Sequence, residues 1–287
     1  MMTYPCVEKS IKIRVIMLEI KNLKNKNRNS NIWMFHRIKT ITNHISDIYK
    51  DRGMVHEIEE LFCLIDKALS EGYKFGSISE AIECSNTIHL TFDDGYKEHL
   101  FIAKELKNRY GLEYGHITFS INVRNSFYPD KLCMDIVYQL MDNNELNKLN
   151  APLGININHT NLDEIKKILF STTKYIEEIN KYVDMNHYFL NEEELVELSK
   201  LFSISSHCIN HCFLTSLSES EVYMELLKSK EYLSAVLNTQ VNTICFPDGK
   251  HSKEINNIAK RVGYKYGLAI APKMKEPIEY NLARCIP

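Results

Sequence analysis

Short apolar runs alternate with longer amphipathic stretches along the chain from residue 32 onward. The short runs are rich in β-branched and aromatic residues and predict strands, whereas apolar residues at three- and four-residue steps predict helices. The predicted strands are 32–36, 87–92, 114–120, 201–205, 243–246 and 266–270, and the predicted helices are 56–71, 97–109, 218–237 and 253–262. Strands and helices that alternate in this way favour a parallel sheet with crossover helices, and therefore an α/β fold.

Two regions depart from this alternation. Residues 21–31 are rich in lysine and asparagine, which is typical of a solvated linker, so we expect 1–30 to form an N-terminal extension and 31–287 to form one domain. Between about 125 and 190 the apolar residues recur at helical steps, as at Ile165, Ile168 and Leu169. This spacing predicts a helical insertion within the domain.

Composition narrows the classes of protein that the chain can belong to. With 44% hydrophobic and 25% charged residues among 287, the chain can bury a large core. Its 35 basic and 37 acidic residues give a net charge of -2, so we do not expect nucleic-acid binding. The eight cysteines lack the spacing of a secreted disulfide module and predict reduced thiols. The pattern gives no indication of an oligomeric state.

Localisation follows from the apolar segments. No window approaches the roughly 20 apolar residues of a membrane span. The first residues lack the apolar centre and the small-residue cleavage site of a signal peptide. We therefore expect a cytoplasmic protein.

Two neighbouring carboxylates, Asp93 and Asp94, follow the predicted strand 87–92 directly. Loops at the carboxyl ends of parallel strands hold the active sites of repeated strand–helix folds. Neighbours on a strand point to opposite faces, so both carboxylates reach one site only if the chain turns, which Gly95 permits. The alternative is a solvated Asp-Asp-Gly turn without a function.

Two histidines, His207 and His211, are four residues apart after the strand 201–205. If this segment is helical, both imidazoles lie on one face and form a chelate for a metal ion. One added carboxylate would complete a three-ligand site with open positions for water. A structural zinc site that also uses Cys208 and Cys212 is the alternative, although on a helix Cys208 would point about 100° away from His207.

Three segments together resemble the motifs of the polysaccharide deacetylases, the carbohydrate esterases with a NodB-homology domain. Residues 91–95 (Thr-Phe-Asp-Asp-Gly) are similar to the first motif, and residues 206–211 are similar to the second, a His-Ser/Thr-x-x-His pattern. The turn Phe246-Pro247-Asp248-Gly249, which alone predicts only a tight loop, is similar to the third. Residues 35–37 (Phe-His-Arg) are similar to the Tyr-His-Arg that opens the fold in one branch. The resemblance covers most of the chain, from 33 to 268, and the order of the motifs makes it specific.

This resemblance implies a distorted (β/α) barrel that hydrolyses an N-acetyl group on a sugar with the help of a divalent metal, most often Zn²⁺. Asp94, His207 and His211 would bind the metal, Asp93 would be the general base, and the third motif would contact the substrate. A metal ion lowers the pKa of its bound water towards about 7 and polarises the amide oxygen. The metal and a backbone amide near the first motif would stabilise the oxyanion.

The chain also departs from the family pattern at three places. Cys208 replaces the hydroxyl residue of the second motif, and a thiol is a weaker hydrogen-bond partner. Cys245 or Phe246 stands where many members have an arginine that orients the base. No histidine follows His251, so the family's C-terminal general acid is missing. His36, at the end of the first strand, is our candidate for that acid, and a hydrogen-bonded core histidine is the alternative.

We therefore expect a de-N-acetylase that acts on a nucleotide- or lipid-linked amino sugar during surface-polysaccharide synthesis. A deformylase, or another hydrolase of linear amides, would use the same metal and water chemistry. A carbohydrate-binding protein that has lost turnover is a further alternative, because the C-terminal histidine is missing. A non-haem iron oxygenase also uses two histidines and one carboxylate, but it would leave Asp93 without a role.

Overall fold

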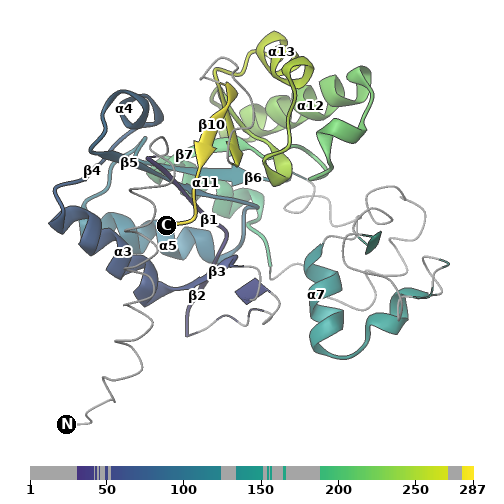
Figure 1. Ribbon diagram of the computed structural model, residues 1–287, viewed down its shortest axis with the longest axis horizontal. Helices are drawn as coiled ribbons and strands as arrows, with labels where there is room; N and C mark the ends of the chain where they lie inside the picture. Colours follow the sequence, from purple (N-terminus) through teal and green to yellow (C-terminus); the bar gives the residue numbers. More distant parts are fainter. Residues whose placement is uncertain are drawn as a thin grey trace.

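Eight parallel strands form the central sheet in the computed structural model (Figure 1). The structure describes residues 31–41, 43, 45, 49–50, 53–123, 134–150, 154, 156, 164–165, 188–270 and 280–287. In order along the chain, the strands of this sheet are β1 (Ile32–Phe35), β4 (Lys74–Phe75), β5 (Thr87–Phe92), β6 (Ile117–Ile121), β7 (Ser203–Ser206), β8 (Thr243–Cys245), β9 (Tyr266–Ile270) and β10 (Leu282–Arg284). A separate pair consists of β2 (Arg37–Lys39) and β3 (Val55–Glu57).

The sheet closes into a barrel because its last strand returns to its first. The strand order is β1-β5-β6-β7-β8-β9-β10, and β4 pairs with the first two residues of β5. Beyond the end of β10, the Cys285 amide donates to the Ile32 carbonyl oxygen at 3.0 Å, and the Cys285 carbonyl accepts from the Met34 amide at 2.8 Å. The predicted (β/α) barrel is therefore confirmed, although the short strand β10 that closes it was not predicted.

Helices cover the outside of the strands. They are α3 (Ile58–Ser70), α4 (Ile78–Glu83), α5 (Glu98–Tyr110), α7 (Met134–Asp142), α11 (Glu192–Leu201), α12 (Glu219–Leu237) and α13 (Lys253–Val262). In Figure 1, α3 and α4 lie on one side of the strands and α12 and α13 lie on the other. Local capping fixes where several helices begin: Ser218, for example, accepts from the Glu221 amide while the Glu221 carboxylate accepts from the Ser218 amide.

Two predicted strand boundaries were wrong for local reasons. The strand predicted from residue 114 begins at Ile117, because Gly115 has a φ of 94° and the His116 amide closes a turn onto the Glu113 carbonyl. The strand predicted from residue 201 begins at Ser203, because α11 continues to Leu201. In contrast, the predicted strands 87–92 and 266–270 and the predicted helix 253–262 have the bounds that the structure shows.

The core lies between the barrel and its helices and includes a stack of aromatic rings. All six residues of β5 are buried, as expected for a strand covered on both faces. The Phe92 ring stacks on Phe35 and Phe119, with centroids 5.2 and 5.0 Å away. His89 is also fully buried; its Nδ1 donates to the Gly76 carbonyl and its Nε2 accepts from the Thr118 hydroxyl. Burial lowers the pKa of His89 to about 4, so the ring is neutral and structural at pH 7.

Helix α7 stands beside the barrel and is tied to it through a buried arginine (Figure 1). The Arg37 guanidinium donates to Glu98 at 2.6 Å and lies 3.7 Å from the Asp135 carboxylate of α7. Burial raises the pKa of Asp135 to about 6, although Arg37 opposes this shift. Helix α7 and the 3-10 turn Leu146–Leu149 fall within the predicted insertion. Much of 125–190 and all of 1–30 lie outside the described residues, so these boundaries stay predictions.

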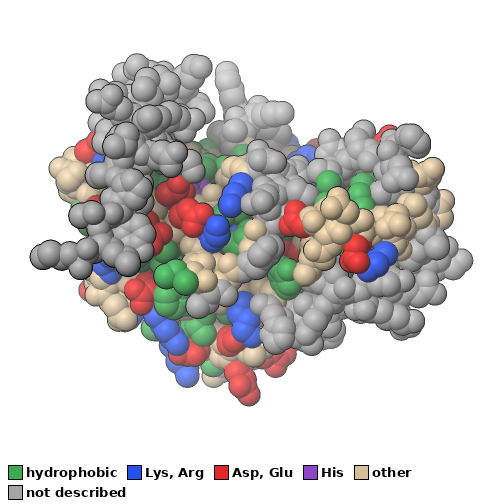
Figure 2. All heavy atoms as spheres, turned by 90° about the horizontal axis from the view of Figure 1, so that it is seen from below, with side chains coloured by type: hydrophobic (Ala, Val, Ile, Leu, Met, Phe, Trp, Pro, Cys, Tyr) green, Lys and Arg blue, Asp and Glu red, His purple; other side chains and the backbone are tan. Residues whose placement is uncertain are grey.

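The apolar character of the helices and the distribution of surface charge are relevant to whether the protein binds membranes or nucleic acids. Among the helices in the described ranges, none combines the length and the apolar character that a bilayer crossing needs. On the face shown in Figure 2, basic and acidic side chains are intermixed over the described residues rather than gathered by sign. This distribution agrees with the near-zero net charge of the chain.

Candidate active site and metal centre

A tight turn brings the two neighbouring carboxylates to the end of β5. After Phe92 the backbone leaves the strand, and Asp94 and Gly95 both adopt left-handed conformations, with φ of 78° and 75°. This conformation is uncommon for a residue other than glycine and costs energy, so Asp94 is a strained residue. The turn that the position of Gly95 predicted is therefore present, and it lets Asp93 and Asp94 face different partners in one site.

The segment that carries the two histidines is an irregular loop, not the helix that their spacing suggested. Residues 207–213 have no helical assignment, and Cys208 and His211 adopt left-handed conformations with φ of 63° and 49°. These two residues bend the chain so that the imidazole rings of His207 and His211 lie with centroids 4.7 Å apart. The rings therefore converge as the i, i+4 spacing predicted, but through loop geometry rather than through a helical face.

The three predicted metal ligands, Asp94, His207 and His211, lie close together in this structure. Asp94 Oδ1 lies 3.4 Å from His207 Nε2 and 3.5 Å from His211 Nε2. Ligand atoms about 2.0–2.2 Å from a tetrahedral zinc ion lie roughly 3.3–3.6 Å from one another, so the observed separations fit such an ion. His207 Nδ1 donates to the Cys245 carbonyl at 2.8 Å, which leaves Nε2 directed at Asp94. The described groups that could hold a metal include neither Cys208 nor Cys212, so the structural-zinc alternative is not supported.

Asp93 lies beside this cluster and is held by other groups. Its Oδ1 accepts from Arg284 Nη1 at 2.7 Å, and the Cys245 thiol lies 3.5 and 3.6 Å from its two oxygens. Burial alone would raise the pKa of Asp93, but Arg284, His207 and His36 outweigh it and hold that pKa well below its usual range. Asp93 is therefore an ionised carboxylate at neutral pH although its side chain is only 2% exposed.

Arg284 is a residue of the candidate site that the sequence analysis did not predict. Its guanidinium, 1% exposed, reaches Asp93 from β10, 191 positions along the chain, and also donates to the Thr91 hydroxyl at 3.3 Å. It supplies the arginine contact that seemed to be missing at Cys245 and Phe246. The only sequence signal was the short run Leu282–Arg284, which is too short for a periodicity to be recognised.

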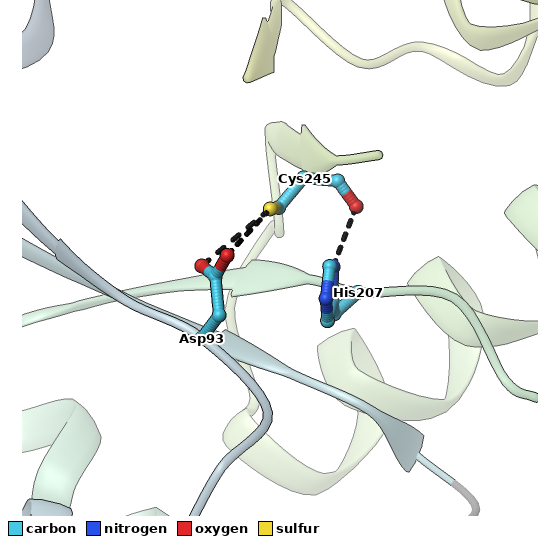
Figure 3. Close-up of side chains that lie close together, drawn as sticks. All are labelled: Asp93, His207 and Cys245. Carbon is cyan, nitrogen blue, oxygen red and sulfur yellow. Dashed lines mark hydrogen bonds between the residues drawn. The ribbon is translucent and has the colours of Figure 1, made fainter. Parts of the chain in front are cut away.

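Cys245 forms a second close group with Asp93 and His207 (Figure 3). Its thiol faces the Asp93 carboxylate, and its carbonyl accepts the hydrogen bond from His207. This group could also hold a metal ion. It fits one less well than the Asp94, His207 and His211 cluster does, because Asp93 is already paired with Arg284 and a bound ion would have to displace that pair.

His36 lies next to Asp93, as its position at the end of the first strand suggested. Its Nε2 is 3.9 Å from Asp93 Oδ2, and its side chain is 13% exposed. Its backbone carbonyl accepts from His99 Nε2 at 2.7 Å, which fixes the backbone at this point. The ring is therefore part of the site and reaches solvent, which favours the catalytic interpretation over that of a core histidine.

The third motif divides into a buried half and a half at the surface. Phe246 is fully buried under Gly267, and its ring stacks on His251 with centroids 5.0 Å apart. Pro247 is buried as well, whereas Asp248 and Gly249 are partly exposed in a 3-10 turn. The side chains of Phe246 and Pro247 therefore pack inside the protein, whereas Asp248 and Gly249 reach the surface, and contact of this motif with a substrate stays a prediction.

Comparisons with known proteins agree with the motifs. Residues 161–267 match the family model described as polysaccharide deacetylase. The putative polysaccharide deacetylase YxkH of Bacillus subtilis is 30% identical over 95 residues, which are 33% of this chain and 34% of that protein. Over these segments the chain is similar to the polysaccharide deacetylases. The match to YxkH spans about a third of its length, and the family match includes the second and third motifs but not the first.

Solved structures share the fold of this chain. The Streptococcus pyogenes deacetylase PplD, solved in complex with acetate, is 18% identical with a TM-score of 0.55, over 89% of this chain and 92% of that one. IcaB from Ammonifex degensii is 11% identical with a TM-score of 0.57, over 91% and 93%. At these identities the likeness establishes the fold but not the activity.

Proposed function

We propose that this protein is a metal-dependent hydrolase of the polysaccharide deacetylase type that removes the N-acetyl group of an amino sugar. One observation carries the proposal: two histidines and Asp94 converge at ligand-like separations beside a second, ionised carboxylate that is not part of the cluster. The match to the polysaccharide deacetylase model and the similarity in fold to the Streptococcus pyogenes deacetylase PplD also support removal of an acetyl group. The oxygenase alternative would leave the buried pair of Asp93 and Arg284 without a role.

We assign a separate role in this reaction to each residue of the site, on the basis of its contacts. Asp94, His207 and His211 would hold a divalent ion, which when bound supplies a water of lowered pKa and polarises the acyl oxygen. Asp93 would accept the proton of the attacking water. Arg284 fixes the orientation of the Asp93 carboxylate and keeps it ionised, which is the form that can accept a proton, while the same lowering of its pKa makes Asp93 a weaker base. Zn²⁺ is the proposed ion because of the mixed nitrogen and oxygen donors.

The function is tested by a screen for new primary amine and released acetate. The substrates are N-acetylated amino sugars in free, nucleotide-linked and lipid-linked form; linked intermediates of surface-polysaccharide synthesis are the ones that we propose. We expect equal amounts of amine and acetate, loss of both after a chelator, and recovery with Zn²⁺. An N-formylated sugar tests the deformylase alternative. A protein that binds zinc but releases amine from no N-acylated sugar would instead be a carbohydrate-binding relative.

We further propose that His36 protonates the leaving amine. It is the partly exposed histidine beside Asp93, and general acids contribute about 10²–10⁴-fold to rates. We expect His36→Gln to lower kcat by about 100-fold while zinc content and Tm stay unchanged. His116→Gln is the matched control, because His116 precedes β6 and so lies at the opposite end of the parallel strands. Unchanged turnover in His36→Gln would remove this residue from the mechanism.

A further inference from the structure

A carboxylate on α12 binds the loop between the two histidines. Glu225 Oε2 accepts from the backbone amides of Ile209 and Asn210, each at 3.1 Å, and Oε1 accepts from the Asn210 side-chain amide. Glu225 lies in the second turn of α12 (Glu219–Leu237) and is separated from the loop by 15 residues. Within the described residues, the three hydrogen bonds of its carboxylate therefore all go to the segment between His207 and His211.

Helix α12 also supports the preceding amide of the loop, that of Cys208, through Ser229 and Ser206. The Cys208 amide donates to the Ser206 hydroxyl at 3.1 Å, and that hydroxyl lies 2.8 Å from the Ser229 hydroxyl. Ser229 is four residues after Glu225 and so lies on the same face of α12. The consecutive amides of Cys208, Ile209 and Asn210 are thus bound by side chains that depend on the position of one helix.

The loop needs such support because its conformation is unfavourable by itself. Cys208 and His211 both have positive φ, a strained state for residues other than glycine that persists only when surrounding contacts impose it. The Cys208 side chain is fully buried in the hydrophobic core, and a thiol is a weak hydrogen-bond partner. In place of a hydroxyl at position 208, the loop is therefore held by Ser206 within the motif and by Glu225 from α12.

We propose that Glu225 is a positioning residue that holds the loop of His207 and His211 in the geometry that binds the metal ion. The inference rests on the proposed function, because it requires the two histidines to be ligands. His207 is fixed separately, through β7 and its bond to the Cys245 carbonyl, whereas His211 directly follows the residues that Glu225 binds. Loss of the Glu225 carboxylate therefore displaces His211 more than His207.

The test measures metal binding directly in the full-length protein. Glu225→Ala is expected to weaken Zn²⁺ binding by about 10–100-fold, measured by competition with a chromophoric chelator, and to change the visible absorption of bound Co²⁺. Glu225→Gln should restore the affinity to within about threefold, because its amide oxygen still accepts the two backbone amides and the Asn210 amide can turn over to pair with it. Glu231→Ala, an equal change of charge at an exposed site of the same helix, should have no effect.

Each outcome decides the inference. Zinc affinity and a cobalt spectrum like those of the unmodified protein in Glu225→Ala would overturn it and leave the proposed function intact. If the unmodified protein binds neither ion, the proposed function fails and the inference fails with it. If Glu225→Ala does not fold, Asn210→Asp decides, because it places a second carboxylate against Glu225 without altering α12. That variant should also lose affinity by about 10-fold or more, and full affinity would contradict the role of Glu225.

Discussion

Replacement of Asp93 by Asn is expected to reduce turnover by about 1,000-fold, with Zn²⁺ affinity within a few-fold of that of the unmodified protein. The amide keeps the size of the side chain but cannot take a proton from water. Asp94, His207 and His211 do not change in this variant, so the metal ligands stay in place. The measurement is the rate of amine release together with the zinc content of the purified variant.

Asp66→Asn is the matched control for this prediction, because Asp66 lies on α3 with its side chain about half exposed and interacts with Arg109 and Tyr110 rather than with the cluster. It should retain full activity. A second comparison separates the roles of the neighbouring carboxylates, since Asp94→Asn should lose metal affinity as well as turnover. If Asp93→Asn keeps the original rate, the general base has been assigned to the wrong residue.

Replacement of Arg284 by Met is expected to destabilise the protein by about 3–5 kcal/mol. The guanidinium and the Asp93 carboxylate are 1% and 2% exposed, so removal of one charge leaves the other buried and unpaired. Turnover should fall as well, because the carboxylate loses its fixed orientation. The free energy of unfolding is measured in urea, and Asp93→Asn in the Arg284→Met background should recover a large part of the loss because the amide is neutral.

Arg261→Met is the control variant, because the pair of Arg261 and Glu219 is exposed and such pairs contribute about 0–1 kcal/mol to stability.

The pH dependence of the stability is a second test of the Asp93 and Arg284 pair. Arg284 lowers the pKa of Asp93, and without it burial raises that pKa, so Asp93 in the variant becomes protonated at a higher pH. The stability gap between the two proteins should therefore narrow as the pH falls. A gap that is small at neutral pH, or that does not depend on pH, would show that the pair contributes little.

The parts of this fold that follow from local pattern could be predicted from the sequence. The strand 87–92 and the helix 253–262 have strong periodicities, and the ends of strands β5 and β7 located Asp93, Asp94 and the histidines. The loop of His207 could not be predicted, because i, i+4 spacing indicates a helix and gives no sign that two non-glycine residues adopt positive φ.

Contacts between residues that lie far apart in the sequence could not be predicted either. Arg284 pairs with Asp93 only because three residues of β10 close the barrel, and Glu225 meets its loop only because α12 packs against β7. In the sequence, each is one charged residue among many on a short strand or an amphipathic helix. Their partners are fixed by the tertiary fold, and a single sequence carries no periodic signal for such contacts.

The late position of β10 has a consequence for biosynthesis. Asp93 leaves the ribosome long before Arg284, which follows 191 residues later. A chain that ends before β10 lacks both the strand that closes the free edge of β1 and the counter-ion of Asp93. We therefore expect such a partly synthesised chain to form neither the closed barrel nor the reactive centre.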